Sequence, residues 1–211
     1  MIEAYAWTTP NGYKLLIALE ELGIPYDLRW INIGKGEQKT PEYLAINPNN
    51  KIPAIRDPEG PDGKPLSVFE SGAVLLYLAD KVGKLVPTDA RDRYVVLEWL
   101  FFNAGGPGPM LGQLGYHKIF GPEPRDERDI ERLTKEAQRL FGVLERRLGE
   151  SRYLGGNELT IADIMNFTWP RAGVQMLGLD VSAFPNLKRW LDELEQRPAV
   201  KRALALKPPA S

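Results

Sequence analysis

One feature limits the folds open to this chain more than any other: its hydrophobic pattern changes at the stretch Gly83–Asp92. Before that stretch, short apolar runs alternate with segments that repeat apolar residues at helical spacing. After it, the pattern is helical throughout. The division predicts a mixed α/β domain followed by an all-α domain. We expect the first domain at residues 1–83, a linker at residues 84–91 and the second domain at residues 92–211.

The first domain is expected to follow the order βαβ-ββα. Its first strand, helix and strand are short and consecutive, which is typical of a unit whose two strands run parallel. A run of turn-forming residues, 57–65, separates the next two apolar runs and predicts a hairpin with a long loop. The expected elements are strands at Ile2–Trp7, Tyr26–Ile33, Ile52–Ile55 and Leu66–Phe69, and helices at Asn11–Leu22, Glu42–Ile46 and Glu70–Val82.

The second domain is expected to contain helices alone. A stretch rich in glycine and proline, residues 105–109, should break or kink its first helix. Thr160 and Asp163 have the spacing of a capping box, to which we assign a structural role. The expected helices are Arg91–Gly105, Arg125–Leu148, Thr160–Leu177, Phe184–Glu195 and Ala199–Leu206. The long helix is amphipathic, and its expected inward residues are Leu133, Ala137, Leu140, Phe141, Leu144 and Leu148.

Charge and hydropathy argue against two classes of partner. The 27 basic and 28 acidic side chains give a net charge of −1, so there is no excess of positive charge for a nucleic-acid backbone. The chain has no run of 18 apolar residues of the kind that spans a membrane. The N-terminus lacks the basic and apolar regions of a signal peptide. We therefore expect a cytoplasmic protein that binds neither nucleic acid nor membrane.

The chain contains no cysteine and a single histidine, His117. Disulfides, thiolate metal sites and a cysteine nucleophile are excluded, and a histidine-based metal site would need more than one histidine. We therefore expect no bound metal. Any sulfur chemistry at this protein must use a sulfur that a ligand brings.

The pair Ile52-Pro53 opens a strand directly after a loop. A proline there cannot donate a hydrogen bond to the sheet. Its peptide bond can be trans, or it can be cis, as in only about 5–6% of X–Pro bonds. In the cis form the backbone of Ile52 could pair with a peptide ligand laid alongside as an added strand. The spacing alone leaves both alternatives open.

Two helix starts are candidate binding positions. At Glu70-Ser71 a strand gives way to a helix; Ser71 can serve as the N-cap, and the pair could also bind the two charged groups of a free amino-acid end. Thr9-Pro10-Asn11 begins the first helix, where Thr9 or Asn11 can be the N-cap. Because ligands bind at the carboxyl ends of strands in βα units, these two residues could also donate hydrogen bonds to a ligand thiolate.

Together these motifs resemble the cytosolic glutathione transferases over nearly the whole chain. Asn49-Asn50-Lys51-Ile52-Pro53-Ala54-Ile55 and Phe69-Glu70-Ser71-Gly72-Ala73 carry the resemblance as a pair. Three further segments are similar to the nu class, the bacterial disulfide-bond oxidoreductases related to a fungal nitrogen regulator. These segments are Thr9-Pro10-Asn11-Gly12, Gly34-Lys35-Gly36-Glu37-Gln38 and residues 105–113. The resemblance implies a thioredoxin-like first domain with a cis Ile52-Pro53 bond.

The resemblance also implies a site for one or two molecules of glutathione, or for its disulfide form. Thr9 and Asn11 are implied as catalytic residues that face the sulfur. The residues implied to bind glutathione are Asn11, Gln38, Lys51, Ile52, Pro53, Glu70, Ser71 and Arg132. Those implied to line a pocket for the second substrate are Trp7, Met110 and Gln113.

The function implied is glutathione-dependent reduction of disulfide bonds, with the glutathione thiolate stabilised by Thr9 and Asn11. Two alternatives stay open. One is a glutathione-binding regulatory protein with little turnover, and the other is a transferase or peroxidase acting on electrophiles or organic hydroperoxides. The partners implied are glutathione, a small disulfide or electrophile, and a second copy of the chain in a homodimer.

Overall fold

The structure is a computed structural model that describes residues 1–209. The chain divides into two compact units. The first combines residues 1–86 with the C-terminal segment that starts at Arg197, and the second comprises residues 87–196. Within the described residues, no helix is both long and apolar enough to cross a membrane.

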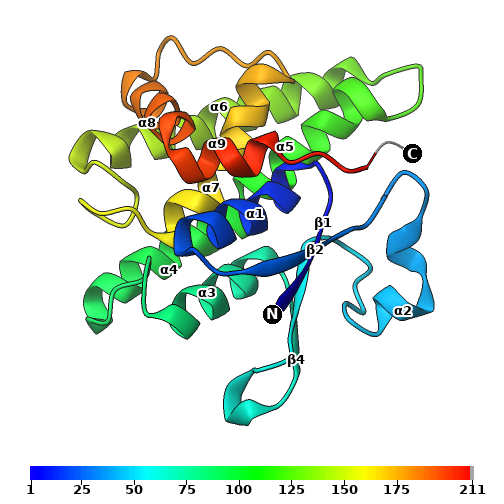
Figure 1. Cartoon of the computed structure of the whole chain (residues 1–211). Helices are drawn as coiled ribbons and strands as arrows, with labels where there is room; N and C mark the ends of the chain where they lie inside the picture. The colour runs from blue at the N-terminus through cyan, green and yellow to red at the C-terminus, as the bar shows by residue number, and fades with distance from the viewer. Residues whose placement is uncertain (210–211) are drawn as a thin grey trace. The chain divides into compact units, whose positions relative to one another are not determined.

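The first unit is built on one mixed sheet. Its elements are β1 Ile2–Ala6, α1 Pro10–Leu22, β2 Tyr26–Trp30, η1 Glu37–Lys39, α2 Pro41–Leu44, β3 Ala54–Asp57, η2 Pro61–Gly63, β4 Leu66–Phe69, α3 Ser71–Val82 and α9 Pro198–Ala205. The strand order is β2-β1-β3-β4; β1 and β2 are parallel, whereas β3 is antiparallel to both of its neighbours. In Figure 1, α1 and α3 lie on one side of the strands and α2 on the other. This is the βαβ-ββα order that the sequence pattern predicts and the thioredoxin-like arrangement that the family resemblance implies.

Burial explains why these segments take these forms. Along β1 the side chains of Ile2, Ala4 and Ala6 are buried and alternate with less buried ones, as expected for a strand with one covered face. α1 buries a row that includes Leu15 and Leu19, and it packs against β1 and α3. The start of α1 is thereby fixed beside the carboxyl end of β1.

β2 is shorter than its sequence pattern predicts. It ends at Trp30 instead of Ile33. The side-chain oxygen of Asn32 accepts hydrogen bonds from the backbone N–H groups of Gly34 and Lys35, at 3.0 and 3.1 Å. These local bonds turn the chain away from the sheet.

The last helix, α9, packs against α1 in the first unit. The Nε and Nη2 atoms of Arg197 donate to the carboxylate of Glu21 at 2.6 and 2.8 Å, and Arg202 Nε donates to Glu20 at 2.6 Å. The sequence pattern assigns this helix to the second domain instead. The domain boundaries stay predictions, but this helix does not group with the second unit.

The second unit contains helices alone. They are α4 Ala90–Gly105, α5 Pro107–Gly115, the π-helical turn η3 Tyr116–Phe120, α6 Glu127–Glu150, α7 Ile161–Gln175 and α8 Pro185–Gln196. The expected break falls between α4 and α5, at Gly106. The buried residues of α6 are the six inward residues that its spacing predicts. η3 is an element that the sequence pattern does not predict.

The capping box at the start of α7 is confirmed. The Asp163 carboxylate is fully buried and accepts from the backbone N–H of Leu154 at 2.9 Å, from Trp190 Nε1 at 3.0 Å, and from both the N–H and the hydroxyl of Thr160 at 3.0 Å. Burial raises the pKa of this carboxyl, and the four donors oppose that shift. Asp163 therefore joins α7, α8 and the loop before α7.

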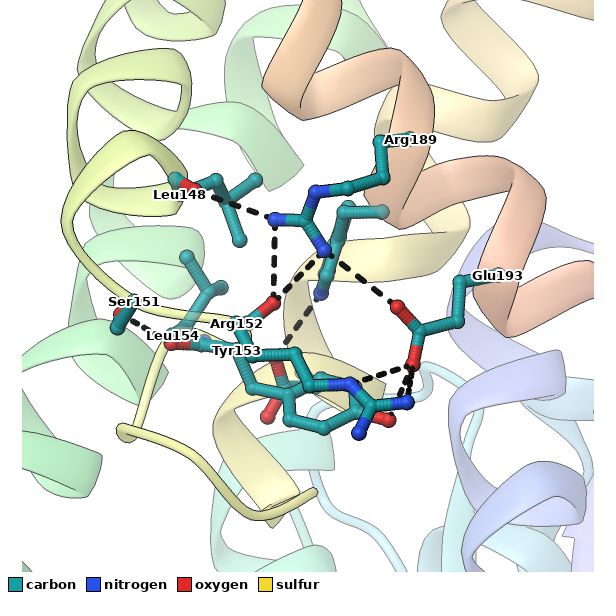
Figure 2. Close-up of polar contacts among 9 residues, drawn as sticks. Leu148, Ser151, Arg152, Tyr153, Leu154, Arg189 and Glu193 are labelled. Atoms are coloured by element: carbon teal, nitrogen blue, oxygen red, sulfur yellow. Dashed lines mark hydrogen bonds and ion pairs between the residues drawn. The ribbon is translucent and has the colours of Figure 1, made fainter.

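Arg189 and Glu193 of α8 also bind the segment between α6 and α7 (Figure 2). Arg189 Nη2 donates to the backbone oxygen of Leu148 near the end of α6 at 3.1 Å. Glu193 Oε1 accepts from Arg152 Nη2 at 2.8 Å and from the hydroxyl of Tyr153 at 2.5 Å. Together with Asp163, these contacts fix the connection between α6 and α7.

Candidate functional site

A cleft of about 190 Å³ lies in the first unit, beside the start of α1. Its walls come from α1, the loop after α2, the turn before β3 and the start of α3. The residues that line it are Asn11, Asn47, Asn49, Lys51, Ile52, Pro53, Glu70 and Ser71. Six of these are among the residues that the family resemblance implies to bind glutathione, so the fold brings most of the predicted site together.

Thr9 is the N-cap of α1. Its Oγ1 accepts a hydrogen bond from the backbone N–H of Gly12 at 3.2 Å. Of the two N-cap candidates, Thr9 and Asn11, it is therefore Thr9 that caps the helix. Since the oxygen acts as an acceptor, the hydroxyl hydrogen can be donated to another group. Thr9 does not line the cleft but stands two residues before Asn11, which does.

The start of α1 approaches the backbone of Trp7 so closely that only glycine fits at position 12. A Cβ there would overlap the carbonyl oxygen of Trp7. We expect Gly12→Ala to lower the free energy of unfolding by about 1–3 kcal/mol, because the helix must shift away from the end of β1. Affinity for glutathione should fall as well, because Asn11 moves with the helix. Denaturant unfolding and titration calorimetry measure the two effects.

Gly105→Ala is the matched control for this substitution. Gly105 ends α4, and a Cβ there would meet no atom within 4 Å. The free energy of unfolding of the Gly105→Ala variant should therefore stay close to that of the unchanged protein. A Gly12→Ala protein as stable as the control would contradict the close approach of α1 to Trp7.

The loop after α2 is shaped by Asn47, which is 1% exposed. Its Nδ2 and the hydroxyl of Tyr43 both donate to the backbone oxygen of Lys51, at 2.7 and 2.6 Å. These bonds hold Lys51, the residue directly before Ile52. The peptide bond between Ile52 and Pro53 is cis. The sequence analysis missed Asn47 and Asn49 as lining residues, although the run of asparagines in this loop is a signal for a side-chain-braced turn.

Glu70, not Ser71, occupies the cap position of α3, so the prediction of Ser71 as N-cap is wrong. Glu70 has a left-handed φ of 67°, and its side chain does not cap the helix. Its backbone conformation turns the chain sharply, which makes Ser71 the first helical residue. The carboxylate of Glu70 accepts from Asn49 Nδ2 at 3.4 Å, so both residues face the same part of the cleft.

Lys14 is a charged residue near the site that sequence reasoning missed. It lies on α1, three residues after Asn11, and is 1% exposed. Burial lowers the pKa of its ammonium group to about 7, and the carboxylate of Glu70 opposes that shift. A buried lysine in an otherwise apolar helix face leaves no sequence signal.

The other predicted site residues lie outside the cleft. Gln38 is in η1; its Nε2 donates to the backbone oxygen of Ile33 at 3.4 Å, and its buried Oε1 has no hydrogen-bond partner among residues 1–209. Trp7 packs edge to face on Trp30, with ring centroids 6.0 Å apart. Arg132 belongs to α6 of the second unit, where its Nη2 lies 3.3 Å from Asp129.

Met110 and Gln113 belong to α5, also in the second unit. A shared pocket of these residues with Trp7, and an approach of Arg132 to the cleft, stay predictions. In the part of the chain that the structure describes, no three His, Asp or Glu side chains gather in a way that could hold a metal ion.

The arrangement suits a peptide ligand with a free amino-acid end. The Glu70 carboxylate can receive an ammonium group, and the backbone amides at the start of α3 can receive a carboxylate. Ile52 lines the same cleft, where its backbone can pair with an extended peptide. Asn11 lines the cleft at the start of α1, and the hydroxyl of Thr9 lies two residues before it.

Comparisons with known proteins match both parts of the chain. Residues 8–81 match the family described as "Glutathione S-transferase, N-terminal domain", and residues 109–198 match "Glutathione S-transferase, C-terminal domain". The disulfide-bond oxidoreductase YfcG of Escherichia coli (strain K12) is 45% identical over 205 residues, which cover 97% of this chain and 94% of that protein.

Two solved structures are similar over almost the full chain. A glutathione transferase from Burkholderia graminis, with two glutathione molecules bound per subunit, is 46% identical with a TM-score of 0.95, covering 99% of this chain and 89% of that one. A glutathione transferase from Pseudomonas putida, with one glutathione disulfide bound per subunit, is 40% identical with a TM-score of 0.93, covering 98% and 92%.

Proposed function

The chain belongs to the glutathione S-transferase family, and we propose that within it the protein is a glutathione-dependent disulfide-bond reductase. The observation that carries the proposal is the cleft that joins Asn11, Ile52, Glu70 and Ser71 in a chain 45% identical to a disulfide-bond oxidoreductase. The ligand that fits the cleft is the tripeptide glutathione, with its γ-glutamyl end at Glu70 and Ser71 and its cysteinyl backbone at Ile52.

Thr9 and Asn11 stabilise the glutathione thiolate in this proposal. The Oγ1 of Thr9 accepts a hydrogen bond from the backbone N–H of Gly12. The hydroxyl hydrogen can therefore be donated to the sulfur, which supports this role. Tyr5 also carries a hydroxyl and lies in β1, before α1. That hydroxyl donates to Glu3 at 3.0 Å, so Tyr5 is a poorer candidate for the thiolate's donor. A hydrogen bond to a charged acceptor contributes about 1.5–3 kcal/mol. That energy corresponds to about one to two units of thiol pKa.

The reaction proceeds by two exchanges. The glutathione thiolate attacks one sulfur of the disulfide substrate, forms a mixed disulfide and displaces the other sulfur as a thiolate, which takes up a proton. A second glutathione then attacks the mixed disulfide, forms glutathione disulfide and releases the second thiol. We assign Arg132 to the second glutathione, and Trp7, Met110 and Gln113 to the disulfide substrate.

The proposal extends to the setting of the reaction. It consumes reduced glutathione, so it belongs in a compartment with a reducing glutathione pool such as the cytoplasm. We also propose that the protein is a homodimer, the commonest assembly of soluble proteins.

Turnover of hydroxyethyl disulfide with glutathione tests this function. We expect a rate well above the uncatalysed exchange, and lower rates with an aryl halide or an organic hydroperoxide. Tight glutathione binding without activity on any of the three substrates would instead favour a regulatory binding protein. Activity confined to the aryl halide or the hydroperoxide would identify a transferase or a peroxidase.

A further inference from the structure

Asn11-Gly12 is the only Asn-Gly pair in the sequence, and the structure gives each of the two residues a reason to be there. Asn11 lines the cleft, and a Cβ at position 12 would overlap the carbonyl oxygen of Trp7. A glycine leaves the preceding asparagine open to attack by the next backbone nitrogen, because it has no Cβ to block the approach and adopts backbone angles that other residues avoid. The cleft is therefore built on a chemically reactive pair.

The reaction open to this pair is deamidation. The backbone nitrogen of Gly12 attacks Cγ of Asn11 and forms a new C–N bond. The side-chain nitrogen of Asn11 leaves as ammonia, which carries away the proton of the Gly12 N–H. Water then opens the five-membered succinimide ring at one of its two carbonyl carbons. The product is an aspartate or an isoaspartate, so a carboxylate replaces the amide, and water is the only co-reactant.

Two features of the start of α1 oppose this reaction. Asn11 is the second residue of the helix, and ring closure requires its backbone to leave the helical conformation. The Gly12 N–H also donates to Thr9 Oγ1 at 3.2 Å, a bond that must break before the nitrogen can attack. Because helix ends open more readily than helix interiors, the rate of deamidation depends on how often this first turn opens.

The charge balance of the cleft makes the new carboxylate important. Lys51 and Glu70 are the charged residues among those that line it, one basic and one acidic. Conversion of Asn11 to an aspartate leaves two acidic groups against one basic group. A ligand with a net negative charge, such as glutathione, then binds against a net repulsion.

We propose that Asn11 is a modification site: it deamidates when the start of α1 opens, the Thr9 cap limits the rate, and the carboxylate that forms weakens the binding of an anionic ligand in the cleft. The modification and its control by Thr9 do not depend on the proposed function. Only the effect on binding rests on it, because glutathione is taken as the ligand.

Peptide mapping by mass spectrometry tests the rate. The protein is incubated in mildly alkaline buffer and digested with trypsin, which releases Met1–Lys14 with Asn11 as its only asparagine. Conversion of the amide to a carboxylate changes the mass of this peptide. We expect the folded protein to deamidate more slowly than a synthetic peptide of the same sequence. Thr9→Val should raise the rate in the folded protein about 5-fold, the factor that loss of one N-cap bond gives.

Thr9→Ser is the matched control, because serine keeps the cap and should leave the rate unchanged. A synthetic peptide with Thr9→Val should react as fast as the unchanged peptide, which excludes an effect on the intrinsic chemistry. Equal rates in the Thr9→Val protein and the unchanged protein would overturn the proposal. It would also be overturned if the folded protein reacted as fast as the peptide, or if neither protein reacted while the peptide was fully converted.

Asn11→Asp tests the effect on the cleft. We expect it to bind S-methylglutathione, which has no thiol, about 5-fold more weakly than the unchanged protein, and the difference should shrink as salt is added. Its free energy of unfolding should be no lower, because an acidic residue in the first turn interacts favourably with the helix dipole. Normal binding, or a weakening that salt does not change, would contradict the role of the charge.

These measurements also distinguish the inference from the proposed function. If Asn11 deamidates under the control of Thr9 but the protein does not reduce hydroxyethyl disulfide, only the proposed function fails. If the protein reduces hydroxyethyl disulfide while Thr9→Val leaves the rate of deamidation unchanged, only the inference fails.

Discussion

Thr9→Val is expected to lower kcat for reduction of hydroxyethyl disulfide by about 10- to 100-fold, the loss of one hydrogen bond to a charged acceptor. Valine keeps the shape of threonine and removes the hydroxyl. The Kd for glutathione should change far less, because the proposed site holds the tripeptide mainly at Ile52, Glu70 and Ser71, which line the cleft. The pKa of the bound thiol, followed by the ultraviolet absorbance of the thiolate, should rise by about one to two units.

Thr9→Ser is the control, because serine restores the hydroxyl and caps helices at least as well as threonine. Its kcat should stay close to that of the unchanged protein. Thr9 also caps α1 through Gly12, so Thr9→Val should lose about 1 kcal/mol of stability, and rates must be compared at a temperature where both variants are folded. A Thr9→Val enzyme with full kcat and an unchanged thiol pKa would exclude Thr9 from the chemistry and leave Asn11 as the candidate.

Asp163→Asn is expected to lower the free energy of unfolding by about 3–5 kcal/mol, near the upper end for a single substitution. The Asp163 carboxylate accepts four hydrogen bonds in the buried junction of α7, α8 and the preceding loop. An asparagine keeps one oxygen but turns an N–H₂ group toward donors, which leaves buried groups unpaired. For a chain of this size we expect Tm to fall by about 6–20 °C, measurable by calorimetry.

Asp180→Asn provides the comparison for Asp163→Asn. The Asp180 carboxylate accepts from the backbone N–H and the hydroxyl of Ser182, at 2.8 and 2.7 Å, in an exposed turn. Its loss should cost much less stability. Folded Asp163→Asn protein should still bind glutathione normally, because Asp163 belongs to the second unit and the cleft to the first. A drop in Tm no larger than that of Asp180→Asn would contradict the junction role.

Local patterns predict those parts of the fold that local physics determines. The inward face of α6 follows from helical spacing alone, and the capping box at Thr160 and Asp163 follows from residues three apart. The βαβ-ββα order likewise follows from short apolar runs and turn-forming residues. In each case the residues that matter are neighbours along the chain.

Features that depend on residues far apart in the sequence cannot be predicted from local sequence patterns. Lys14 is buried by the packing of other segments around α1. The packing of α9 on α1 includes the pairs Arg197–Glu21 and Arg202–Glu20, whose members are 176 and 182 positions apart in the sequence. Glu70 adopts a left-handed backbone that its residue type does not favour. For that reason the sequence pattern predicts Ser71 as the N-cap, whereas Glu70 holds that position in the structure. The cleft was predictable as a set of residues only through resemblance to a family.

The docking of α9 on α1 has a consequence for biosynthesis. A ribosome makes α1 before the second unit and α9 after it, so the first unit is missing one of its packed helices until the second unit has been translated. Folding domain by domain from the N-terminus is therefore interrupted, because Glu20 and Glu21 pair with arginines that are made only after the second unit. A nascent chain stopped before residue 197 would carry every residue of the cleft and still lack the helix that covers the back of α1.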